Sequence, residues 1–336
     1  MQDHIAQPVV VITGASAGVG RATAREFAKK GYQIALLARS EAGLDGARRD
    51  VEALGGTALA IPTDVSDHAQ VEAAAQRIEE ELGLIDVWIN NAMQSVFSPF
   101  DQMTADEFKQ VVDVTFLGQV YGTMAALKRM IPRNRGTIVM VGSALAYRGI
   151  PLQSAYCASK HASKGFFDSV RAELLHDNSE VQLTMVHLSA VNSTQFNWVK
   201  SRLPNKGKPM GKVYQPEVAA RAIFYTAHHK RRSVFVGVGP FQTSIGNTFI
   251  PGLLDRLLAK TGYAGQQTDQ PEDPDRPNNL WEPIAEDRGA HGSFDEEAAA
   301  KSAELLVSSN RGLSAAIVTG TAVGVAGLVY WWKSLR

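Results

Sequence analysis

Short runs of apolar, mostly β-branched residues recur along the first 260 positions of the chain. Their nearly unbroken apolar character is typical of strands buried on both faces of a sheet. The runs cover residues 9–13, 33–38, 58–63, 86–90, 137–143, 182–188 and 233–237. Longer stretches with helical spacing of apolar residues separate them, among them 21–30, 69–82, 105–130 and 155–176. This alternation predicts an α/β fold, a doubly wound parallel sheet with helices on both faces.

The pattern changes after residue 260. Residues 261–311 contain eleven acidic residues and four prolines, a composition that predicts a poorly structured acidic linker. Leu280, Trp281 and Ile284 are the apolar residues expected to dock back onto the preceding domain. We therefore divide the chain into a globular domain (1–260), an acidic linker (261–311) and a hydrophobic helix (312–333).

The hydrophobic helix is predicted from residues 313–332, which carry no charge. Twenty helical residues span about 30 Å, the thickness of the bilayer hydrocarbon core. Tyr330, Trp331 and Trp332 stand where an aromatic belt would lie. The segment is thus predicted to be a transmembrane helix that anchors the protein to a membrane. A peripheral Gly/Ala-rich helix and a helix that binds another protein are the alternatives.

Composition narrows the function classes. Lys+Arg and Asp+Glu number 34 each, so the chain lacks the basic excess of nucleic-acid-binding proteins. A single cysteine, Cys157, excludes an intrachain disulfide and a cysteine-cluster metal site. His161 and His187 have no partners at metal-ligand spacing, so no metal is expected.

A glycine-rich turn, Thr-Gly-Ala-Ser-Ala-Gly-Val-Gly, occupies residues 13–20, between the first strand and the first helix. Glycines there permit a tight turn and close approach of the backbone to a ligand. The helix N-terminus directs free N–H groups at an anion such as pyrophosphate. The turn predicts dinucleotide binding through Gly14, Ser16, Gly18, Val19 and Gly20. A purely structural turn is the alternative.

The end of the second strand indicates which dinucleotide is bound. An acidic residue there would bind the ribose 2′-hydroxyl of NAD, whereas this chain has Arg39. A guanidinium favours a 2′-phosphate, so NADP is expected and NAD is disfavoured. The alternative is an ordinary surface arginine.

Three further residues point to acid/base chemistry. Tyr156 and Lys160 are four residues apart on a predicted helix, so they share one face. Ser143 ends the fifth strand, and both elements should open at the carboxyl edge of the sheet. A nearby ammonium lowers the pKa of a phenol from its ordinary value of ~10. Ser143 would then donate to a substrate oxygen while Tyr156 exchanges a proton with it.

With these residues the chain resembles the short-chain dehydrogenase/reductase family over residues 8–260. The resemblance is carried by the turn 13–20, Asp64-Val65, Asn90-Asn91-Ala92, Ser143 and Tyr156-Cys-Ala-Ser-Lys160. It implies a seven-stranded Rossmann sheet and hydride transfer between NAD(P)H and a carbonyl or an alcohol. It also implies that Asp64 and Val65 lie at the adenine, Asn91 near the cofactor ribose and Lys160 on the nicotinamide ribose. A homo-oligomer is compatible with the resemblance.

The chain departs from the family pattern at three places. Met93 replaces a glycine, and Ser189-Ala190 replaces Pro-Gly after the sixth strand. Thr115 stands where the family has an asparagine that holds a water in the proton relay. A threonine hydroxyl can hold a water as well, so Thr115 joins the predicted catalytic residues.

Residues 189–215 are expected to cover the substrate. They contain five basic residues and no acidic one: Lys200, Arg202, Lys206, Lys208 and Lys212. This excess of positive charge favours an anionic ligand. The alternative is a basic loop that is merely solvated. Phe196, Trp198 and Tyr214, with Phe97 and Phe100 after the fourth strand, offer apolar surface for a hydrophobic substrate.

The sequence therefore predicts a membrane-anchored, NADP-dependent oxidoreductase that acts on a small-molecule carbonyl or alcohol. Its catalytic domain is expected in the cytoplasm, where NADPH is found. The alternative is a sensor or scaffold that binds NADP(H) on the same fold without turnover.

Overall fold

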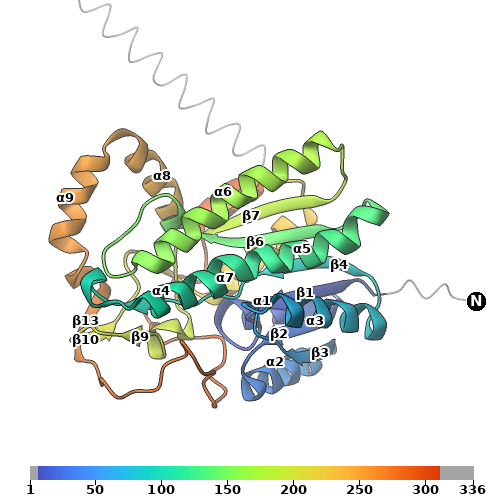
Figure 1. The fold of residues 1–336 in the computed structure, drawn as a ribbon, viewed down its shortest axis with the longest axis horizontal. Helices are drawn as coiled ribbons and strands as arrows, with labels where there is room; N and C mark the ends of the chain where they lie inside the picture. Colours follow the sequence, from blue (N-terminus) through green and yellow to red (C-terminus); the bar gives the residue numbers. More distant parts are fainter. Residues whose placement is uncertain (1–6, 311–336) are drawn as a thin grey trace, which may run out of the picture.

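The computed structural model describes residues 7–310, and its centre is a seven-stranded sheet (Figure 1). The strand order is β12-β7-β6-β4-β1-β2-β3, and every neighbouring pair is parallel. The bounds are β1 (Val9–Thr13), β2 (Gln33–Ala38), β3 (Thr57–Pro62), β4 (Ile85–Asn90), β6 (Thr137–Ser143), β7 (Gln182–Leu188) and β12 (Ser233–Val236). The predicted fold is confirmed, and each predicted strand end lies within one residue of the observed end.

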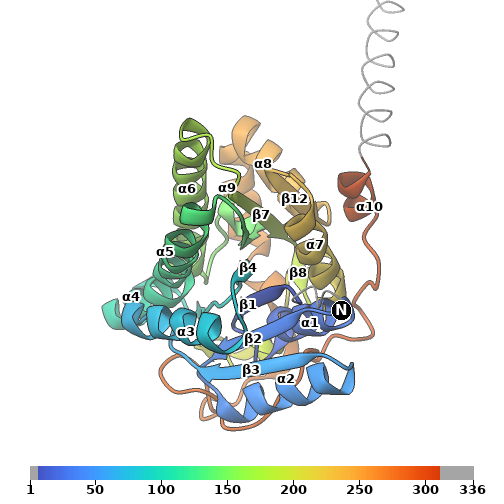
Figure 2. The ribbon, with the colours of Figure 1, turned by 90° about the vertical axis from the view of Figure 1, so that its right-hand side faces the viewer.

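Helices cover both faces of this sheet (Figure 2). One face carries α1 (Gly18–Ala28), α2 (Glu41–Ala53) and α7 (Pro216–His228). The other carries α3 (His68–Glu81), α5 (Gly118–Met130) and α6 (Ser154–His176). Because the central strands are buried on both faces, their side chains feed two separate hydrophobic clusters, which explains the unbroken apolar runs.

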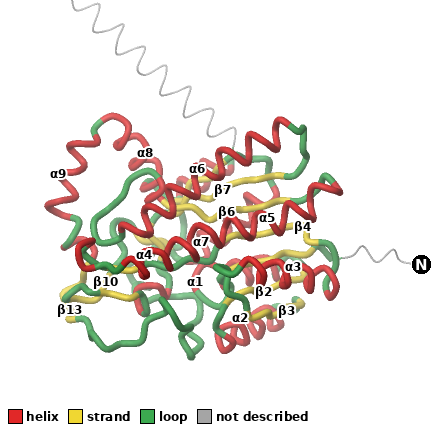
Figure 3. The backbone as a smooth tube through the Cα atoms, in the orientation of Figure 1, coloured by secondary structure: helices red, strands yellow, loops and turns green. Residues whose placement is uncertain are grey.

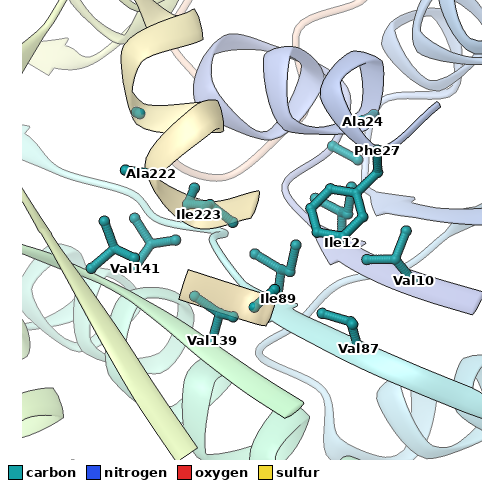
Figure 4. Packing of buried hydrophobic residues seen from close by; sticks show 14 of the residues in the cluster. Val10, Ile12, Ala24, Phe27, Val87, Ile89, Val139, Val141, Ala222 and Ile223 are labelled. Atoms are coloured by element: carbon teal, nitrogen blue, oxygen red, sulfur yellow. The ribbon is translucent and has the colours of Figure 1, made fainter. Parts of the chain in front are cut away.

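Figure 4 shows how one of these clusters is packed. Val10 and Ile12 of β1 and Ile89 of β4 point toward α1 and α7. Phe27 of α1 and Ile223 of α7 fill the space above the strands, and all five side chains are fully buried. This packing fixes the strands relative to the helices, and so fixes the edge at which the strands end.

The predicted long helix 105–130 is divided in the structure. It consists of α4 (Ala105–Val112), a π-helical turn (Asp113–Leu117) and α5. The Thr115 hydroxyl donates to the Gln94 carbonyl and accepts from the Gln94 N–H, both at 2.9 Å. These two bonds fasten the widened turn to the segment after β4. Such turns often lie at functional sites.

Smaller elements lie beyond the carboxyl ends of the strands. Three short strand pairs are formed by β5 (Val96–Phe97) with β9 (Lys200–Ser201), β8 (Ala190–Val191) with β11 (Val213–Tyr214), and β10 (Asn205–Gly207) with β13 (Gln267–Pro271). In Figure 3, α8 (Gly239–Phe249) and α9 (Pro251–Thr261) form a hairpin at this end of the molecule. The last described helix is α10 (Ala303–Ser309).

The acidic segment after residue 261 is packed against the domain, in contrast to the poorly structured linker that its composition predicts. Gln266 is fully buried and donates to the carbonyls of Pro151 and Gly262 at 2.9 and 2.8 Å. Leu280 is fully buried as well, as expected from its apolar character. A few tertiary anchors therefore order a segment whose average composition is that of a linker. The predicted domain boundaries stay a prediction.

The predicted transmembrane helix, 312–333, lies outside the described residues. Between residues 7 and 310, none of the helices combines the length and the apolar character needed to cross a bilayer.

Candidate active site

A cavity of about 690 Å³ opens at the carboxyl ends of the strands. Its size falls in the usual range of ligand sites. The segments after β1, β2, β4, β6 and β7 all contribute to its wall. Nearly all the predicted site residues line it: Gly14, Ser16, Gly18, Val19, Arg39, Asp64, Val65, Asn91, Ser143, Tyr156 and Lys160.

The glycine-rich turn has a geometry that requires glycine. Gly14 and Gly18 adopt φ of +66° and +55°, which side chains disfavour. A Cβ added to Gly20 would lie 2.2 Å from the carbonyl oxygen of Gly14, so α1 packs directly on the turn. Among residues 7–310, no acceptor receives the backbone N–H of Val19 or of Gly20. The turn therefore presents unpaired donors at the helix N-terminus, where an anion would bind.

Asn91 joins the end of β4 to this turn. Its side-chain amide donates to the Thr13 carbonyl at 2.9 Å, and its backbone N–H donates to the Thr13 hydroxyl at 2.9 Å. Asn91 therefore holds the shape of the turn in addition to lining the cavity.

Arg39 lies at the end of β2, on the cavity wall. Its guanidinium donates to the carbonyls of Trp281 and Asn279 at 2.6 and 2.5 Å. Burial lowers the pKa of Arg39, and the charges of Asp64 and Glu282 partly oppose this effect. A guanidinium has five N–H donors and stays charged in proteins. Three donors are therefore left for a ligand.

Ser143, Tyr156 and Lys160 meet at the other end of the cavity. The Ser143 hydroxyl accepts a hydrogen bond from the Leu145 N–H at 3.1 Å and is also hydrogen-bonded with Tyr156. The Lys160 ammonium donates to the Val141 carbonyl at 2.8 Å and lies 5.5 Å from the centre of the Tyr156 ring. The i, i+4 spacing on α6 thus brings the lysine beneath the tyrosine.

Electrostatics in this triad differ from the expectation. Burial raises the pKa of Tyr156 above its ordinary value, and a hydrogen bond with Ser143 partly offsets the rise. Burial also lowers the pKa of Lys160 to about 7. Desolvation is the dominant effect on Tyr156, and it favours the neutral phenol. A neutral phenol is the form that donates a proton.

Thr115 is the predicted catalytic residue that does not line the cavity. It is fully buried, and its one hydroxyl proton is donated to Gln94. Its predicted part in a proton relay is untested, while its bonds to Gln94 show that it positions the wall segment after β4.

Four of the five basic residues of segment 189–215 divide into two groups, while Lys206 is exposed and donates to the Gln270 side chain at 3.1 Å. Burial raises the pKa of Glu107. Hydrogen bonds from Arg202 and Lys200 outweigh this effect and bring the pKa down to about 2. Both cations lie within 3 Å of the same Glu107 oxygen, at 2.8 and 2.9 Å, so they have a structural partner. Lys208 and Lys212 instead line the cavity, and these two could meet an anionic ligand.

The aromatic residues divide in the same way. Phe196, Trp198 and Tyr214 line the cavity. Phe97 does not, because it is fully buried, with its ring 6.0 Å from that of Phe196. Phe100 is 69% exposed and also lies outside the cavity wall. The expectation that Phe97 and Phe100 line the cleft is therefore wrong.

Sequence reasoning missed two parts of the cavity wall. One is the hairpin, where Leu254, Leu257 and Leu258 of α9 face the cavity. Their i, i+3, i+4 spacing is a signal of an apolar helix face. The other is the acidic segment, which contributes Asn279, Pro283, Ile284, Glu286 and Arg288. In the sequence, only the expected docking of Ile284 onto the domain indicated a role for this segment.

Comparisons with known proteins agree with this geometry. The sequence model of the short chain dehydrogenases matches residues 8–203. An uncharacterised oxidoreductase of Bacillus subtilis, YxnA, is 32% identical over 276 residues, which cover 82% of this chain and 78% of the relative. Dehydrogenase/reductase SDR family member 7C of Rattus norvegicus is 30% identical over 75% of this chain and 84% of the relative.

Two solved structures are similar as well. One is an alcohol dehydrogenase from the archaeon Thermococcus sibiricus, complexed with 5-hydroxy-NADP. The other is a metagenomic short-chain oxidoreductase in complex with NADP. They share 27% and 25% identity with this chain, each with a TM-score of 0.59, and each covers 68% of this chain and 96% of its own. The chain therefore belongs to the short-chain dehydrogenase family, as an NAD(P)-dependent dehydrogenase/reductase.

Proposed function

We propose that the protein is an NADP-dependent oxidoreductase that interconverts a carbonyl and an alcohol, with Tyr156 as the acid/base. The observation that carries this proposal is a single cavity with two chemical ends. One end holds the glycine-rich turn and Arg39, and the other holds Ser143, Tyr156 and Lys160.

The first end fits an NADP dinucleotide. The turn leaves the N–H groups of Val19 and Gly20 without an acceptor among the described residues, as a pyrophosphate site requires. Arg39 lies at the end of β2, where a 2′-phosphate would be, with donors to spare. The two similar solved structures hold NADP or a derivative of it. Asp64 and Val65 would flank the adenine, and Asn91 and Lys160 the ribose groups.

When bound, the dinucleotide supplies or accepts a hydride. The residues of this chain manage the matching proton. Tyr156 donates its phenolic proton to the substrate oxygen during reduction and takes it back during oxidation. Ser143 donates a second hydrogen bond to the same oxygen. Lys160 lies beneath the ring, where its positive charge stabilises the phenolate that forms.

The cavity wall favours a hydrophobic substrate. Phe196, Trp198 and the leucines of α9 provide apolar surface, while Lys208 and Lys212 provide positive charge. The test is a screen of hydrophobic aldehydes and ketones with NADPH, and of alcohols with NADP+. Pairs of neutral and carboxylated compounds of equal length should separate the contribution of the two lysines.

Arg39→Asp should reverse the cofactor preference. Loss of a charge-assisted contact to the 2′-phosphate is worth ~1.5–3 kcal/mol, about ten- to a hundredfold in NADPH affinity. The new carboxylate should improve NADH binding. Titration of nicotinamide fluorescence measures both affinities.

The control for this variant is Arg48→Asp, an exposed arginine of α2 that pairs with Asp45 at 3.2 Å. It should leave both affinities unchanged. Equal affinity of the unmodified protein for NADH and NADPH would refute the role of Arg39.

We also propose that residues 313–332 anchor the protein to a membrane with its catalytic domain in the cytoplasm. The uncharged 20-residue stretch supports this. The exposed apolar side chains of the α8–α9 hairpin give further support, since Phe249 and Leu253 are 77% and 61% exposed.

Fractionation of lysed cells should place the full chain with the membranes and a chain ending at Asn310 in the soluble fraction. Extraction of the full chain by detergent, but not by high salt, is expected of a transmembrane helix. Recovery of both chains in the soluble fraction would show that the anchor assignment is wrong.

A further inference from the structure

Residues 279–292, which we name the strap, cross the cofactor half of the cavity from the outside. In Figure 1 the orange-red segment that follows β13 runs toward α2. The strap lines the cavity through Asn279, Pro283, Ile284, Glu286 and Arg288, next to the glycine-rich turn and Arg39. A dinucleotide in this cavity would therefore lie against the strap.

One end of the strap is bonded to the predicted 2′-phosphate site. The carbonyls of Asn279 and Trp281 accept from the Arg39 guanidinium. The neighbouring Ser40 hydroxyl donates to the Ile284 carbonyl at 2.9 Å. These bonds aim the guanidinium along the cavity wall, so the strap sets the direction in which Arg39 meets a ligand.

The other end is bonded to the predicted pyrophosphate site. The Gly289 carbonyl accepts from the Gly18 N–H at 3.1 Å. Asp287 pairs with Arg21 of α1, whose side chain is almost fully buried. Arg288, between these two anchors, faces the cavity and pairs with Glu286 at 2.7 Å. A second cation is thus held beside the turn that would bind the cofactor phosphates.

Two buried residues fix the strap to the body. Leu280 packs in a cluster with Val96 and Val111 and is fully buried. Ala290 packs with Ala22 of α1 and Ala220 of α7. The strap itself lies outside residues 8–203, which the family's sequence model matches.

We propose that the strap is a clamp that completes the cofactor site. Arg288 contacts the phosphates of the bound dinucleotide, and Asn279 and Trp281 orient Arg39 toward its 2′-phosphate. Because the strap lies along the cofactor half of the cavity, its release speeds the entry and exit of the dinucleotide. This inference rests on the proposed function, since it assumes that NADP occupies the cavity.

Both ends of the strap are anchored to the body, and His291 also pairs with Glu217 of α7 at 2.8 Å. Before the strap, the chain is held by the β10–β13 pair and by Arg276, which donates to the carbonyls of Phe196 and Val199 at 3.0 and 2.8 Å. Beyond Ile284, the anchors on α1 are the Asp287 ion pair, the bond from Gly18 and the Ala290 contact. Opening is expected where these anchors separate from α1.

A disulfide lock tests the proposal. Ala22, Ala220 and Ala290 pack in one cluster, so cysteines at these positions would lie close together. Two full-length variants are made, Ala290→Cys with Ala220→Cys and Ala290→Cys with Ala22→Cys. NADPH is bound to the reduced protein, the disulfide is closed, and excess NADP+ then displaces the NADPH while its fluorescence is followed.

The oxidised variants should release NADPH about tenfold more slowly or slower still, because the opened state is no longer reached. Reduction should restore the original rate. Ala290→Cys alone is the control, and the native Cys157 is buried and should not compete. Equal release rates before and after oxidation, with the disulfide verified by mass spectrometry, would overturn the clamp.

Loosening the strap should have the opposite effect, and this measurement needs no disulfide. Asp287→Ala should accelerate NADPH release about three- to tenfold, because it removes the ion pair to Arg21. An unchanged release rate in this variant would also contradict the proposal.

Arg288→Ala separates the phosphate contact from the role of Arg39. Loss of a contact to the pyrophosphate should weaken NADPH and NADH equally, by about three- to tenfold. Arg48→Ala, on the exposed face of α2, is the matched control. Unchanged affinity for both cofactors would remove Arg288 from the site.

These results are distinguishable from a failure of the proposed function. Release and affinity are measured without a substrate, so they do not depend on turnover. An unmodified protein that binds no NADPH would overturn both the proposed function and the clamp. A protein that binds NADPH but exchanges it equally fast with the strap locked would overturn the clamp alone.

Discussion

Tyr156→Phe should abolish turnover and leave NADPH binding nearly unchanged. The substitution removes one oxygen atom, and with it the only proton that the tyrosine side chain can exchange with the substrate. General acid–base catalysis contributes about 10²- to 10⁴-fold to a rate, so kcat should fall by at least about a hundredfold. The ring itself remains, and it is the ring that packs in the cluster with Val96, Val111 and Leu280. Cofactor affinity, measured by fluorescence, should therefore change little.

Tyr263→Phe is the matched control, because this tyrosine is 48% exposed and does not line the cavity. It should retain full activity. A Tyr156→Phe protein with near-normal kcat would remove the tyrosine from the mechanism. Loss of NADPH binding together with activity would show that Tyr156 acts in cofactor docking instead.

Gly20→Ala should weaken cofactor binding about ten- to a hundredfold. The new Cβ would lie 2.2 Å from the Gly14 carbonyl oxygen and 2.7 Å from the Asn91 side-chain nitrogen. The turn must move, because a backbone oxygen cannot yield as a flexible side chain can. Overpacking of this kind costs about 1–3 kcal/mol of stability. Displaced N–H donors would account for the loss of NADPH affinity, at ~1.5–3 kcal/mol for a charge-assisted bond.

Gly165→Ala provides the comparison. Gly165 lies on the exposed face of α6, and an added Cβ there meets nothing within 4 Å. This variant should raise the free energy of unfolding by about 0.4–1 kcal/mol and leave cofactor affinity unchanged. Calorimetry and fluorescence titration measure the two quantities. Normal NADPH affinity in Gly20→Ala would contradict the phosphate-binding role of the turn.

The sheet could be predicted from the sequence because parallel strands buried on both faces leave an uninterrupted apolar signal. The break in the helix over 105–130 could not be predicted in this way. Apolar spacing continues through Asp113–Leu117, and the π-helical turn there is fastened by Thr115 and Gln94, which are 21 residues apart. A hydrogen bond of that range has no periodic signature.

The acidic segment shows a second limit of sequence reasoning. Its average composition is that of a linker, yet single residues such as Gln266 and Leu280 are fully buried in the domain. A composition average conceals isolated anchors, since one buried leucine among acidic residues changes the mean very little. For the same reason the strap was absent from the predicted site, although Arg39 was present.

The site residues that carry chemistry were predictable because their roles demand particular side chains at particular element ends. Glycines open α1, Ser143 ends β6, and Tyr156 and Lys160 share one face of α6. The apolar wall was less predictable, since any large hydrophobic side chain can serve. The sequence therefore suggested Phe97 and Phe100, whereas the structure places the leucines of α9 there.

The central claim is that this cavity performs NADP-linked oxidation and reduction instead of merely binding NADP(H). The most direct test uses NADPH that carries deuterium at its transferable position, incubated with the full chain and a panel of hydrophobic aldehydes and ketones. Mass spectrometry then follows the label. We predict one deuterium on the former carbonyl carbon of the alcohol for each NADPH consumed, and none with Tyr156→Phe. Tight binding of NADPH with no label transfer across the panel would contradict the claim and favour a cofactor-binding sensor.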